Sequence, residues 1–376
     1  MSFISWILAF LLFLSIPPVY SWSFPFFGTV FVVLYLLLMA ILGRTTFSSI
    51  IYIVLLSFLY LYFGLRNDVS VGGVLYYFSM CFLFLSSQDL SSDVFGKFCK
   101  ITAFLLIPGI VYYLLVLFGI ASFLPTETVM ALNDSKEYRY VYYVPFLLMP
   151  EHFDANFFRF TFVFDEPGVV GTLCGVLLLV KGIHFKSWET YSVLIAGILS
   201  FSLAFFAMLF MAMLLDGKVK EIIWIIILFL IVIISLRVFD IDFISTYLLE
   251  RLKPDSGVGF SGNNRVSESF NRVFKEFSGT SDFFFGMGHW MSKTKNFGGA
   301  SYKDLIYDNG IVFFVLYAMA FLSYAFHQLK NNKLFLVYFG IFFGVMYQRP
   351  FIHSVIYFVL LLFPIAYLSQ LNKSSK

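Results

Sequence analysis

The first 43 residues of this 376-residue chain contain no Asp, Glu, Lys or Arg. An uncharged stretch of that length is stable only in hydrocarbon or inside a very large protein core, because nothing in it can cover a surface that faces water. Charged residues make up only 12% of the whole chain, about half of the roughly 25% that soluble domains carry. The sequence therefore predicts a polytopic integral membrane protein and excludes an ordinary soluble domain.

A membrane-spanning helix needs about 20 apolar residues, with about 17 as a working minimum. Stretches near this length recur along the chain and predict an all-α transmembrane bundle of about 10–12 spans. The candidates are Ser2–Pro17, Ser23–Leu42, Phe47–Leu65, Val71–Ser86, Ile101–Phe123, Pro167–Val180, Tyr191–Leu215, Ile222–Leu236, Ile311–Phe326, Leu334–Tyr347 and Ile352–Leu368. We expect one integral membrane domain over residues 1–376, with the first span retained because it lacks the basic region of a signal peptide.

Lysine pairs between the predicted spans indicate the orientation. Short cytoplasmic loops accumulate Lys and Arg, so we assign all the pairs, and both ends of the chain, to the cytoplasm. Two long segments, residues 124–156 and 239–308, then become outer loops. The lysine pairs are Lys97/Lys100, Lys181/Lys186, Lys218/Lys220, Lys330/Lys333 and Lys373/Lys376.

Only Tyr191–Leu215 conflicts with this arrangement, because lysine pairs flank it on both sides and one crossing would leave one pair outside. The 26 uncharged residues 190–215 also carry Gly197, Ser200 and Ser202 near their middle. We therefore predict a tight hairpin of two short helices that enters the membrane and returns. The alternative is one long tilted helix with one misplaced pair.

On this topology the two cations separate by type. Ten of the 16 lysines lie inside, whereas eight of the nine arginines, all but Arg44, lie outside. The guanidinium fork pairs bidentately with phosphate or carboxylate, while Lys acts as a point charge. The outer arginines predict that an anionic headgroup is bound at the outer face, with Arg251, Arg272 and Arg349 as substrate-binding candidates. Alternatively, they pair with acidic residues of the same loops.

The segment Arg159–Gly168 reads RFTFVFDEPG and is the first candidate site. Pro167 suits the first position of a helix, which places Glu166 at the positive end of the helix dipole. The helix from there to Lys181 rises only about 22 Å at about 1.5 Å per residue. Glu166 should therefore start below the outer interface, and a carboxylate at that depth is a functional candidate. The alternative is a helix cap paired with Arg159.

The second candidate region lies in the outer segment 239–308. Within Ser267–Phe277, apolar residues recur at the i, i+3, i+4 and i+7 positions while Arg272 falls on another face. This pattern predicts an amphipathic helix on the membrane surface; alternatively, its aromatic stripe packs on the bundle. Arg265 precedes this helix. His289 follows it and is a candidate general base, although a lone loop histidine is more often a surface or packing residue.

Other chemistry is not indicated. Cys81, Cys99 and Cys174 fall in or beside apolar spans without metal-binding spacing, so neither a disulfide framework nor a zinc site is predicted. Residues 257–262 match GxGxxG, but they lie between membrane helices and are interpreted as a loop. The net charge of +3 is too small to indicate nucleic acid. We expect no cofactor, no metal and no nucleic-acid partner.

The order of these motifs resembles the O-antigen polymerase (Wzy) family and, more distantly, the O-antigen ligases. In that family an Arg precedes an F-x-E-P element that enters a membrane helix, here Arg159 and residues 164–167. A later Arg and an f-G-x-G element match Arg265 and residues 285–288, and a Gly that starts the next span matches Gly310. The resemblance covers most of the chain.

Two departures from the family pattern stand out. Many relatives, notably the ligases, carry a His-Asn where this chain has Gly299-Ala300, which favours polymerase over ligase. The Ser-Arg that many relatives have at the hairpin bend is Ser202-Leu203 here, which removes one cation from the site.

The resemblance implies a glycosyltransferase-C-like bundle in the bacterial inner membrane, with residues 124–156 and 239–308 as the first and the large periplasmic loop. Such enzymes join repeat units carried on undecaprenyl pyrophosphate at the periplasmic face. Glu166 would be the base or orienter, and Arg159 and Arg265 would bind pyrophosphate. Expected partners are the lipid-linked oligosaccharide, membrane lipid and a chain-length regulator protein. The alternatives are an O-antigen ligase and a flippase or transporter, which usually shows an internal repeat or ionisable groups near the midplane.

Overall fold

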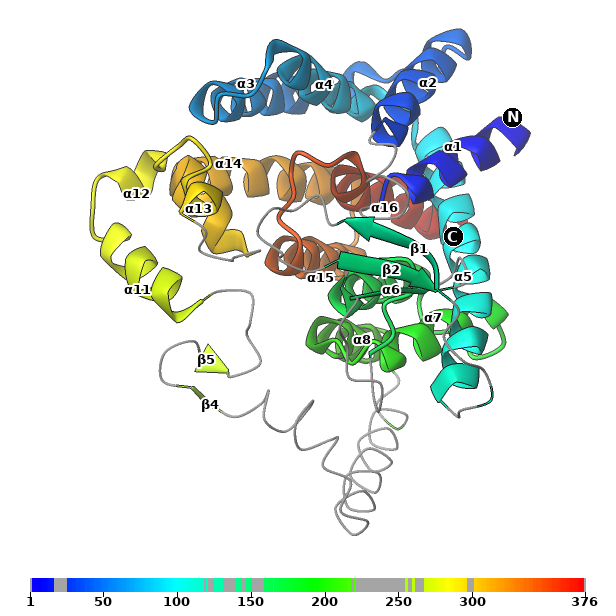
Figure 1. The fold of residues 1–376 in the computed structure, drawn as a ribbon. Coiled ribbons are helices and arrows are strands. Elements are labelled where there is room, and N and C mark those ends of the chain that lie inside the picture. Colours follow the sequence, from blue (N-terminus) through cyan, green and yellow to red (C-terminus); the bar gives the residue numbers. More distant parts are fainter. Residues whose placement is uncertain are drawn as a thin grey trace.

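The computed structural model describes residues 2–16, 26–117, 120, 125–130, 139–143, 147–150, 159–164, 166–217, 220, 254–255, 259–260, 267–295 and 301–374. They form a helical bundle with small strands outside it (Figure 1). The helices are α1 (Ser2–Leu14), α2 (Phe27–Ile41), α3 (Ile50–Arg66), α4 (Val71–Cys81), α5 (Gln88–Leu117), α6 (Pro167–Lys181), α7 (Trp188–Leu199), α8 (Leu203–Leu215), α11 (Glu268–Phe277), α12 (Asp282–Phe285), α13 (Met291–Thr294), α14 (Tyr302–Leu329), α15 (Asn332–Gln348) and α16 (Val355–Ser374), with short 3-10 helices η1 (Phe47–Ser49) and η2 (Phe82–Leu85).

The strands lie in the two segments that were predicted as outer loops. An antiparallel sheet of order β1-β2-β3 and an antiparallel pair β4-β5 occur there. Their bounds are β1 (Pro125–Met130), β2 (Arg139–Tyr143), β3 (Leu147–Pro150), β4 (Pro254–Asp255) and β5 (Gly259–Phe260). The helical bundle was predicted, whereas these small sheets were not.

Three helices are long and apolar enough to cross a membrane, namely Gln88–Val116, Tyr302–Leu329 and Val355–Lys373. Further apolar helices of 10–17 residues accompany them in the described part of the chain. Because a full crossing needs about 17 residues or more, helix length supports a membrane protein without fixing the number of spans.

Two predicted spans begin earlier than expected. Helix α5 starts at Gln88 rather than at Ile101, and α14 starts at Tyr302 rather than at Ile311. Gly310 interrupts α14 with φ 88° and ψ 160°, so the part of α14 before it is a separate short helix joined to the long span. The predicted span Ile222–Leu236 lies outside the described residues.

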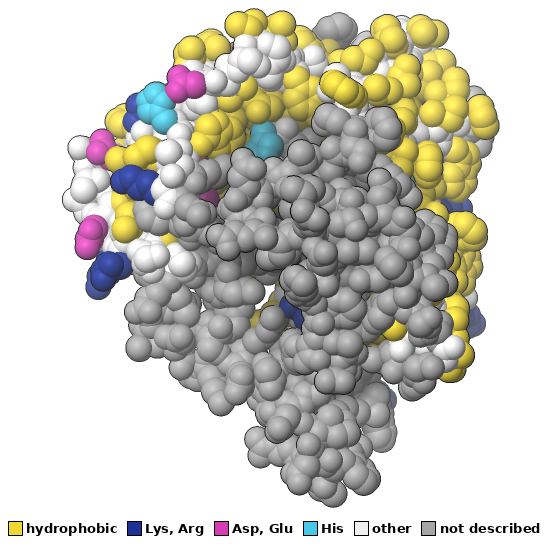
Figure 2. Space-filling model, in the orientation of Figure 1, with side chains coloured by type: hydrophobic (Ala, Val, Ile, Leu, Met, Phe, Trp, Pro, Cys, Tyr) yellow, Lys and Arg dark blue, Asp and Glu magenta, His cyan; other side chains and the backbone are white. Residues whose placement is uncertain are grey.

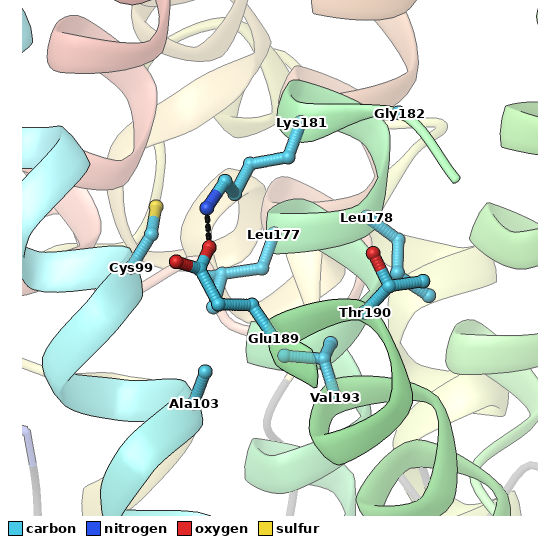
Figure 3. Close-up of a pocket in the computed structure, with 9 residues that line it drawn as sticks. All are labelled: Cys99, Ala103, Leu177, Leu178, Lys181, Gly182, Glu189, Thr190 and Val193. Atoms are coloured by element: carbon cyan, nitrogen blue, oxygen red, sulfur yellow. Dashed lines mark ion pairs between the residues drawn. The ribbon is translucent and has the colours of Figure 1, made fainter. Parts of the chain in front are cut away.

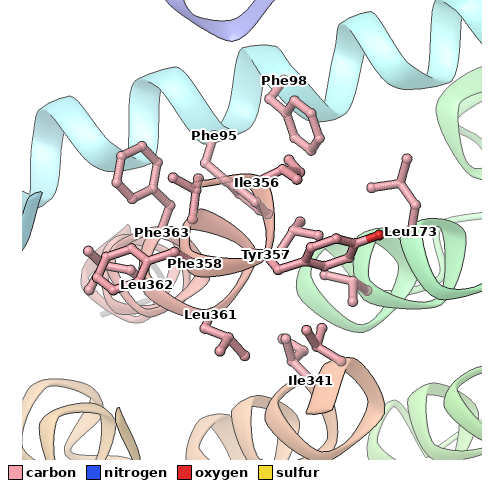
Figure 4. Close-up of a cluster of buried hydrophobic side chains, with 14 of the residues drawn as sticks. Phe95, Phe98, Leu173, Ile341, Ile356, Tyr357, Phe358, Leu361, Leu362 and Phe363 are labelled. Atoms are coloured by element: carbon pink, nitrogen blue, oxygen red, sulfur yellow. The ribbon is translucent and has the colours of Figure 1, made fainter. Parts of the chain in front are cut away.

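Helix α16 occupies the centre of the bundle. In its span, 78% of the residues are buried, against 39% in the span of α5. Figure 4 shows aromatic and aliphatic side chains of α16, among them Phe358 and Leu361, packed between α5, α6 and α15. Phe95 of α5 and Leu173 of α6 belong to the same cluster. A helix that is apolar on every side, as α16 is, has no polar face to turn toward water, and burial on all sides follows.

The periphery of the bundle exposes apolar side chains. Phe58, Leu65 and Leu75 are between 58% and 74% exposed. In Figure 2 hydrophobic side chains cover the surface over α2, α3 and α4, whereas charged side chains gather over α11 and α12. An apolar surface of this extent is unfavourable in water and suits contact with lipid.

The predicted hairpin of two short helices is confirmed, whereas its insertion into the membrane stays a prediction. Helices α7 and α8 are separate and are joined by a short turn at Ser200–Ser202, in which Phe201 adopts a left-handed conformation with φ 47°. The small and hydroxyl-bearing residues that suggested a bend therefore mark the turn itself.

Both free ends of this hairpin return to the Lys181 end of α6. Glu189 at the start of α7 pairs with Lys181. Asp216, directly after α8, accepts a hydrogen bond from the Ile183 amide at 2.9 Å. A single long helix would have carried one of these two ends to the opposite side of the bundle.

Candidate functional site

The candidate site is built at the Glu166 end of α6. Glu166 is the N-cap, in an extended conformation with φ −141° and ψ 140°, and Pro167 follows at the start of the helix as predicted. The Glu166 side chain makes no capping hydrogen bond. Instead, its Oε2 accepts a hydrogen bond from Nη2 of Arg349 at 2.6 Å, and Arg349 directly follows α15.

The two members of this ion pair differ in exposure. The Arg349 side chain is 4% exposed, whereas the Glu166 side chain is 35% exposed. A buried guanidinium is stable only with a partner, and a charge-assisted bond of this length is a strong one. The pair therefore fixes a carboxylate that remains accessible at the entrance to α6. The predicted alternative, a side-chain cap of the helix, is not what the Glu166 side chain does.

Arg159 anchors the turn of the α7–α8 hairpin. Its Nε donates to the carbonyl of Ser200 at 2.9 Å and its Nη2 to the carbonyl of Phe201 at 3.0 Å. A planar fork of donors is suited to bonding two adjacent carbonyls at once. Two of the Arg159 donors are thus used within the fold. These bonds do not test the predicted role of Arg159 in binding pyrophosphate, which stays a prediction.

The hairpin turn lies directly against the first half of α6. A Cβ built on Gly171 would lie 2.2 Å from the Ser202 Cβ and 3.2 Å from the Ser200 Oγ. No side chain fits at Gly171 unless the turn moves away. The turn, Arg159 and the entrance to α6 therefore form one packed unit.

The opposite end of α6 carries a different ion pair. The Lys181–Glu189 pair lies in a pocket between α5, α6 and α7 (Figure 3). Cys99, Ala103 and Val193 contribute to its otherwise mainly apolar lining. The side chains of Lys181 and Glu189 are 25% and 13% exposed, so both partners are mostly buried.

A third element is the strap, defined as Gly286–Trp290, which lies between the end of α3 and the break in α14. The amides of residues 287, 288 and 289 donate to the carbonyls of Tyr307, Asp308 and Arg66 at 2.8, 2.9 and 2.8 Å. The Arg66 guanidinium in turn donates to the carbonyl of Gly286. The strap thus joins two helices, mainly through backbone atoms.

The glycines of the f-G-x-G pattern and Gly310 form a close backbone contact. Gly286 has φ 79°, and a Cβ there would lie 2.4 Å from the Asp308 carbonyl oxygen. Gly310 has φ 88°, and a Cβ there would lie 2.2 Å from the Phe284 carbonyl oxygen. Only glycine combines positive φ with such a close approach, so no other residue fits at Gly286 or Gly310 without a shift of the backbone.

Buried polar side chains reinforce the strap. Asn67 Nδ2 donates to Asn309 Oδ1 at 2.7 Å, while the Trp290 amide donates to Asn67 Oδ1 at 3.1 Å. The Ser292 amide and hydroxyl donate to the two Asp308 carboxylate oxygens at 2.9 and 2.6 Å. Sequence reasoning missed this network, because its members are neighbours only across more than one helix.

His289 projects from the strap toward the α3–α4 turn. Its Nδ1 lies 2.5 Å from Asp68 Oδ2, and both side chains are exposed. Sequence analysis had no indication of Asp68. In the structure, the candidate His289 therefore has a carboxylate partner, although at an exposed position.

The amphipathic helix was predicted at α11, and its apolar side turns toward the bundle. Phe270 and Phe277 are buried, and their rings lie 5.5 and 4.8 Å from the ring of Tyr307 in α14. The stripe therefore packs on the protein, which is the second of the two interpretations given above. Arg272 is exposed on the opposite side.

Several predicted site residues fall outside the described part of the chain. These are Arg251 and Arg265; Asp165, which precedes Glu166 in the segment RFTFVFDEPG, also lies outside the described residues. Among the described residues, no three His, Cys, Asp or Glu side chains are grouped closely enough to hold a metal ion.

Comparison with protein-family models found none that matches this chain, and comparisons with curated proteins and with solved structures found no significant similarity.

Proposed function

We propose that this chain is a membrane glycosyltransferase that polymerises repeat units carried on undecaprenyl pyrophosphate, at the periplasmic face of a bacterial inner membrane. The observation that supports this most is the Glu166–Arg349 pair, in which a buried guanidinium holds an accessible carboxylate at the entrance to α6. The motif order from Arg159 to Gly310 supports the choice of polymerase.

In the proposed reaction, a hydroxyl oxygen of the acceptor saccharide attacks the anomeric carbon of a second lipid-linked repeat unit. The bond from that carbon to the pyrophosphate oxygen breaks, and its electron pair leaves with the pyrophosphate. Glu166 accepts the hydroxyl proton, for which it must be ionised. The neighbouring Arg349 favours that charged form, and a positioned base contributes about 10²–10⁴-fold.

The leaving pyrophosphate needs fixed cations, because stabilisation of developing charge is a large part of such catalysis. We assign this role to Arg265 and Arg251, with Arg159 holding the hairpin turn that borders the site. Arg272 on the exposed side of α11 is assigned to the phosphate-rich membrane surface. No metal is required by this scheme.

The orientation is part of the proposal. The Glu166 end of α6 faces the periplasm, and the Lys181 end faces the cytoplasm together with the other lysine pairs. With the shorter helices counted as spans or half-spans, the bundle has about 10–12 spans.

Deletion of the gene in its bacterium tests the reaction. Lipopolysaccharide separated by gel should then carry a single O-repeat on its core, because ligation continues without polymerisation, and the wild-type gene should restore the ladder. Lipopolysaccharide without any O-repeat would reject polymerisation and favour the ligase or the flippase.

A further inference from the structure

Three aromatic rings follow one another beside the Glu166–Arg349 pair. The Arg349 guanidinium carbon lies 5.8 Å from the centre of the Phe351 ring. Phe351 and His353 are 5.8 Å apart between ring centres, and His353 and Trp290 are again 5.8 Å apart. Phe351 and His353 follow α15, whereas Trp290 comes from the strap, so two distant segments meet to make the series.

Trp290 is held in an unusual backbone conformation. Its φ is 49°, and that of the preceding His289 is 52°. Non-glycine residues are strained in this region and persist there only where the surroundings impose the conformation. Here the Asn67 side chain accepts from the Trp290 amide at 3.1 Å, and the Phe63 ring meets the indole edge-on at 5.3 Å. The strap thus fixes the indole beside His353.

The chemistry at the two ends of the series differs from its middle. Phe351, His353 and Trp290 are all partly accessible. At one end lies the accessible Glu166 carboxylate, and at the other the exposed His289–Asp68 pair. A row of rings ended by hydrogen-bonding groups suits a ligand that has apolar C–H faces and a rim of hydroxyls. A lipid tail would match the rings but not the polar ends.

We propose that Phe351, His353 and Trp290 form a saccharide-binding subsite that runs from the Glu166–Arg349 pair to the His289–Asp68 pair. Sugar rings stack on the aromatic faces, and the His289–Asp68 pair bonds hydroxyls of a more distant sugar. The inference rests on the proposed function in one respect, namely that the saccharide is the lipid-linked repeat unit. It gives His289 a binding role instead of the catalytic role expected from the sequence.

The test is calorimetric titration of the purified full chain in detergent with one free repeat unit of the cell's own surface polysaccharide, without its lipid. Trp290→Ala should weaken binding about tenfold, as expected for loss of one aromatic stacking contact. Trp290→Phe, which keeps a ring against Phe63, should stay within about threefold. Trp188→Ala, at an exposed tryptophan of α7, is the matched control and should bind as wild type.

Elution in size-exclusion chromatography checks the fold of each variant. If Trp290→Ala aggregates, Phe351→Leu and His353→Leu replace it, and each should weaken binding several-fold. The subsite is rejected if wild type does not bind the repeat unit, or if folded variants at these rings bind it as wild type does. Binding that depends on Trp290, together with an unchanged ladder after gene deletion, would keep the subsite and reject the polymerase.

Discussion

The two ends of α6 carry one ion pair each, and the pairs are built differently. At the Lys181 end both partners are mostly buried, with side chains 25% and 13% exposed, and they join α6 to the base of the hairpin. At the Glu166 end the cation is 4% exposed and the carboxylate 35% exposed. One pair is enclosed by the fold, whereas the other presents its acid to the surroundings.

This difference separates structural from functional charge. A buried pair whose partner is removed leaves an uncompensated charge, so its loss is felt mainly in stability. The Glu166 carboxylate is in addition accessible and can meet a substrate, so its loss should be felt in activity as well as in stability. The cation types agree with this, because Lys acts as a point charge while Arg holds a carboxylate in a fixed direction.

The largest expected effect comes from Glu166→Gln, which is compared with the matching substitution Glu189→Gln at the other end of α6. Glu166→Gln keeps the shape but loses the proton-accepting carboxylate, so polymerisation per protein molecule should fall by about 100-fold or more. Glu189→Gln should retain its activity per molecule and lose about 1–3 kcal/mol of stability, because Lys181 is left without its charged partner. Ladder intensity against immunoblotted protein and thermal unfolding in detergent measure the two effects.

The comparison would be broken if Glu189→Gln lowered the activity per molecule as much as Glu166→Gln does. Normal polymerisation by Glu166→Gln, with only lower abundance in Glu166→Ala, would make Glu166 a structural residue. The base would then have to be sought at His289.

The next effect concerns the break in α14 at Gly310, where two backbones meet rather than two charges. Gly310→Ala puts a methyl group 2.2 Å from the Phe284 carbonyl oxygen at φ 88°, and should cost at least about 2 kcal/mol. Gly72→Ala is the control, because a Cβ at Gly72 meets nothing within 4 Å. A Gly310→Ala protein with the melting temperature of wild type would show that this backbone contact does not stabilise the fold.

A smaller effect is expected from Arg159→Lys. The substitution keeps the charge but cannot bond the Ser200 and Phe201 carbonyls at once, so the hairpin turn should loosen and polymerisation should fall about tenfold. Arg44→Lys is the control, since the Arg44 guanidinium pairs with Asp89 of α5 at the long distance of 4.0 Å. Equal activity of the two variants would mean that the fork of Arg159 is not needed.

Local features of this molecule followed from the sequence. The hairpin was predicted because lysine pairs flank an uncharged stretch with small residues at its centre. Pro167 and Glu166 were placed correctly because a helix start has a local signal. The helix at α11 was also predicted, since its apolar residues recur at helical spacing.

Long-range contacts did not follow from the sequence. The bond between Glu166 and Arg349 joins residues 183 positions apart, and no periodicity encodes such a meeting. Arg349 was named only as one of several arginines, and Asp68 not at all. The apolar side of α11 was compatible with lipid or protein, and only the position of Tyr307 decides between them.

The proposed site requires that the two ends of α6 face opposite sides of the membrane. The most direct test of this orientation is labelling of single cysteines in intact cells. The native cysteines, all buried, are first replaced, and Lys186→Cys, Lys220→Cys and Lys275→Cys are made one at a time at exposed positions. A membrane-impermeant maleimide should label Lys275→Cys on α11 in intact cells. Lys186→Cys and Lys220→Cys, on either side of the hairpin, should react only after the inner membrane is permeabilised. Labelling of either of these two in intact cells, or protection of Lys275→Cys, would contradict the orientation on which the proposed site depends.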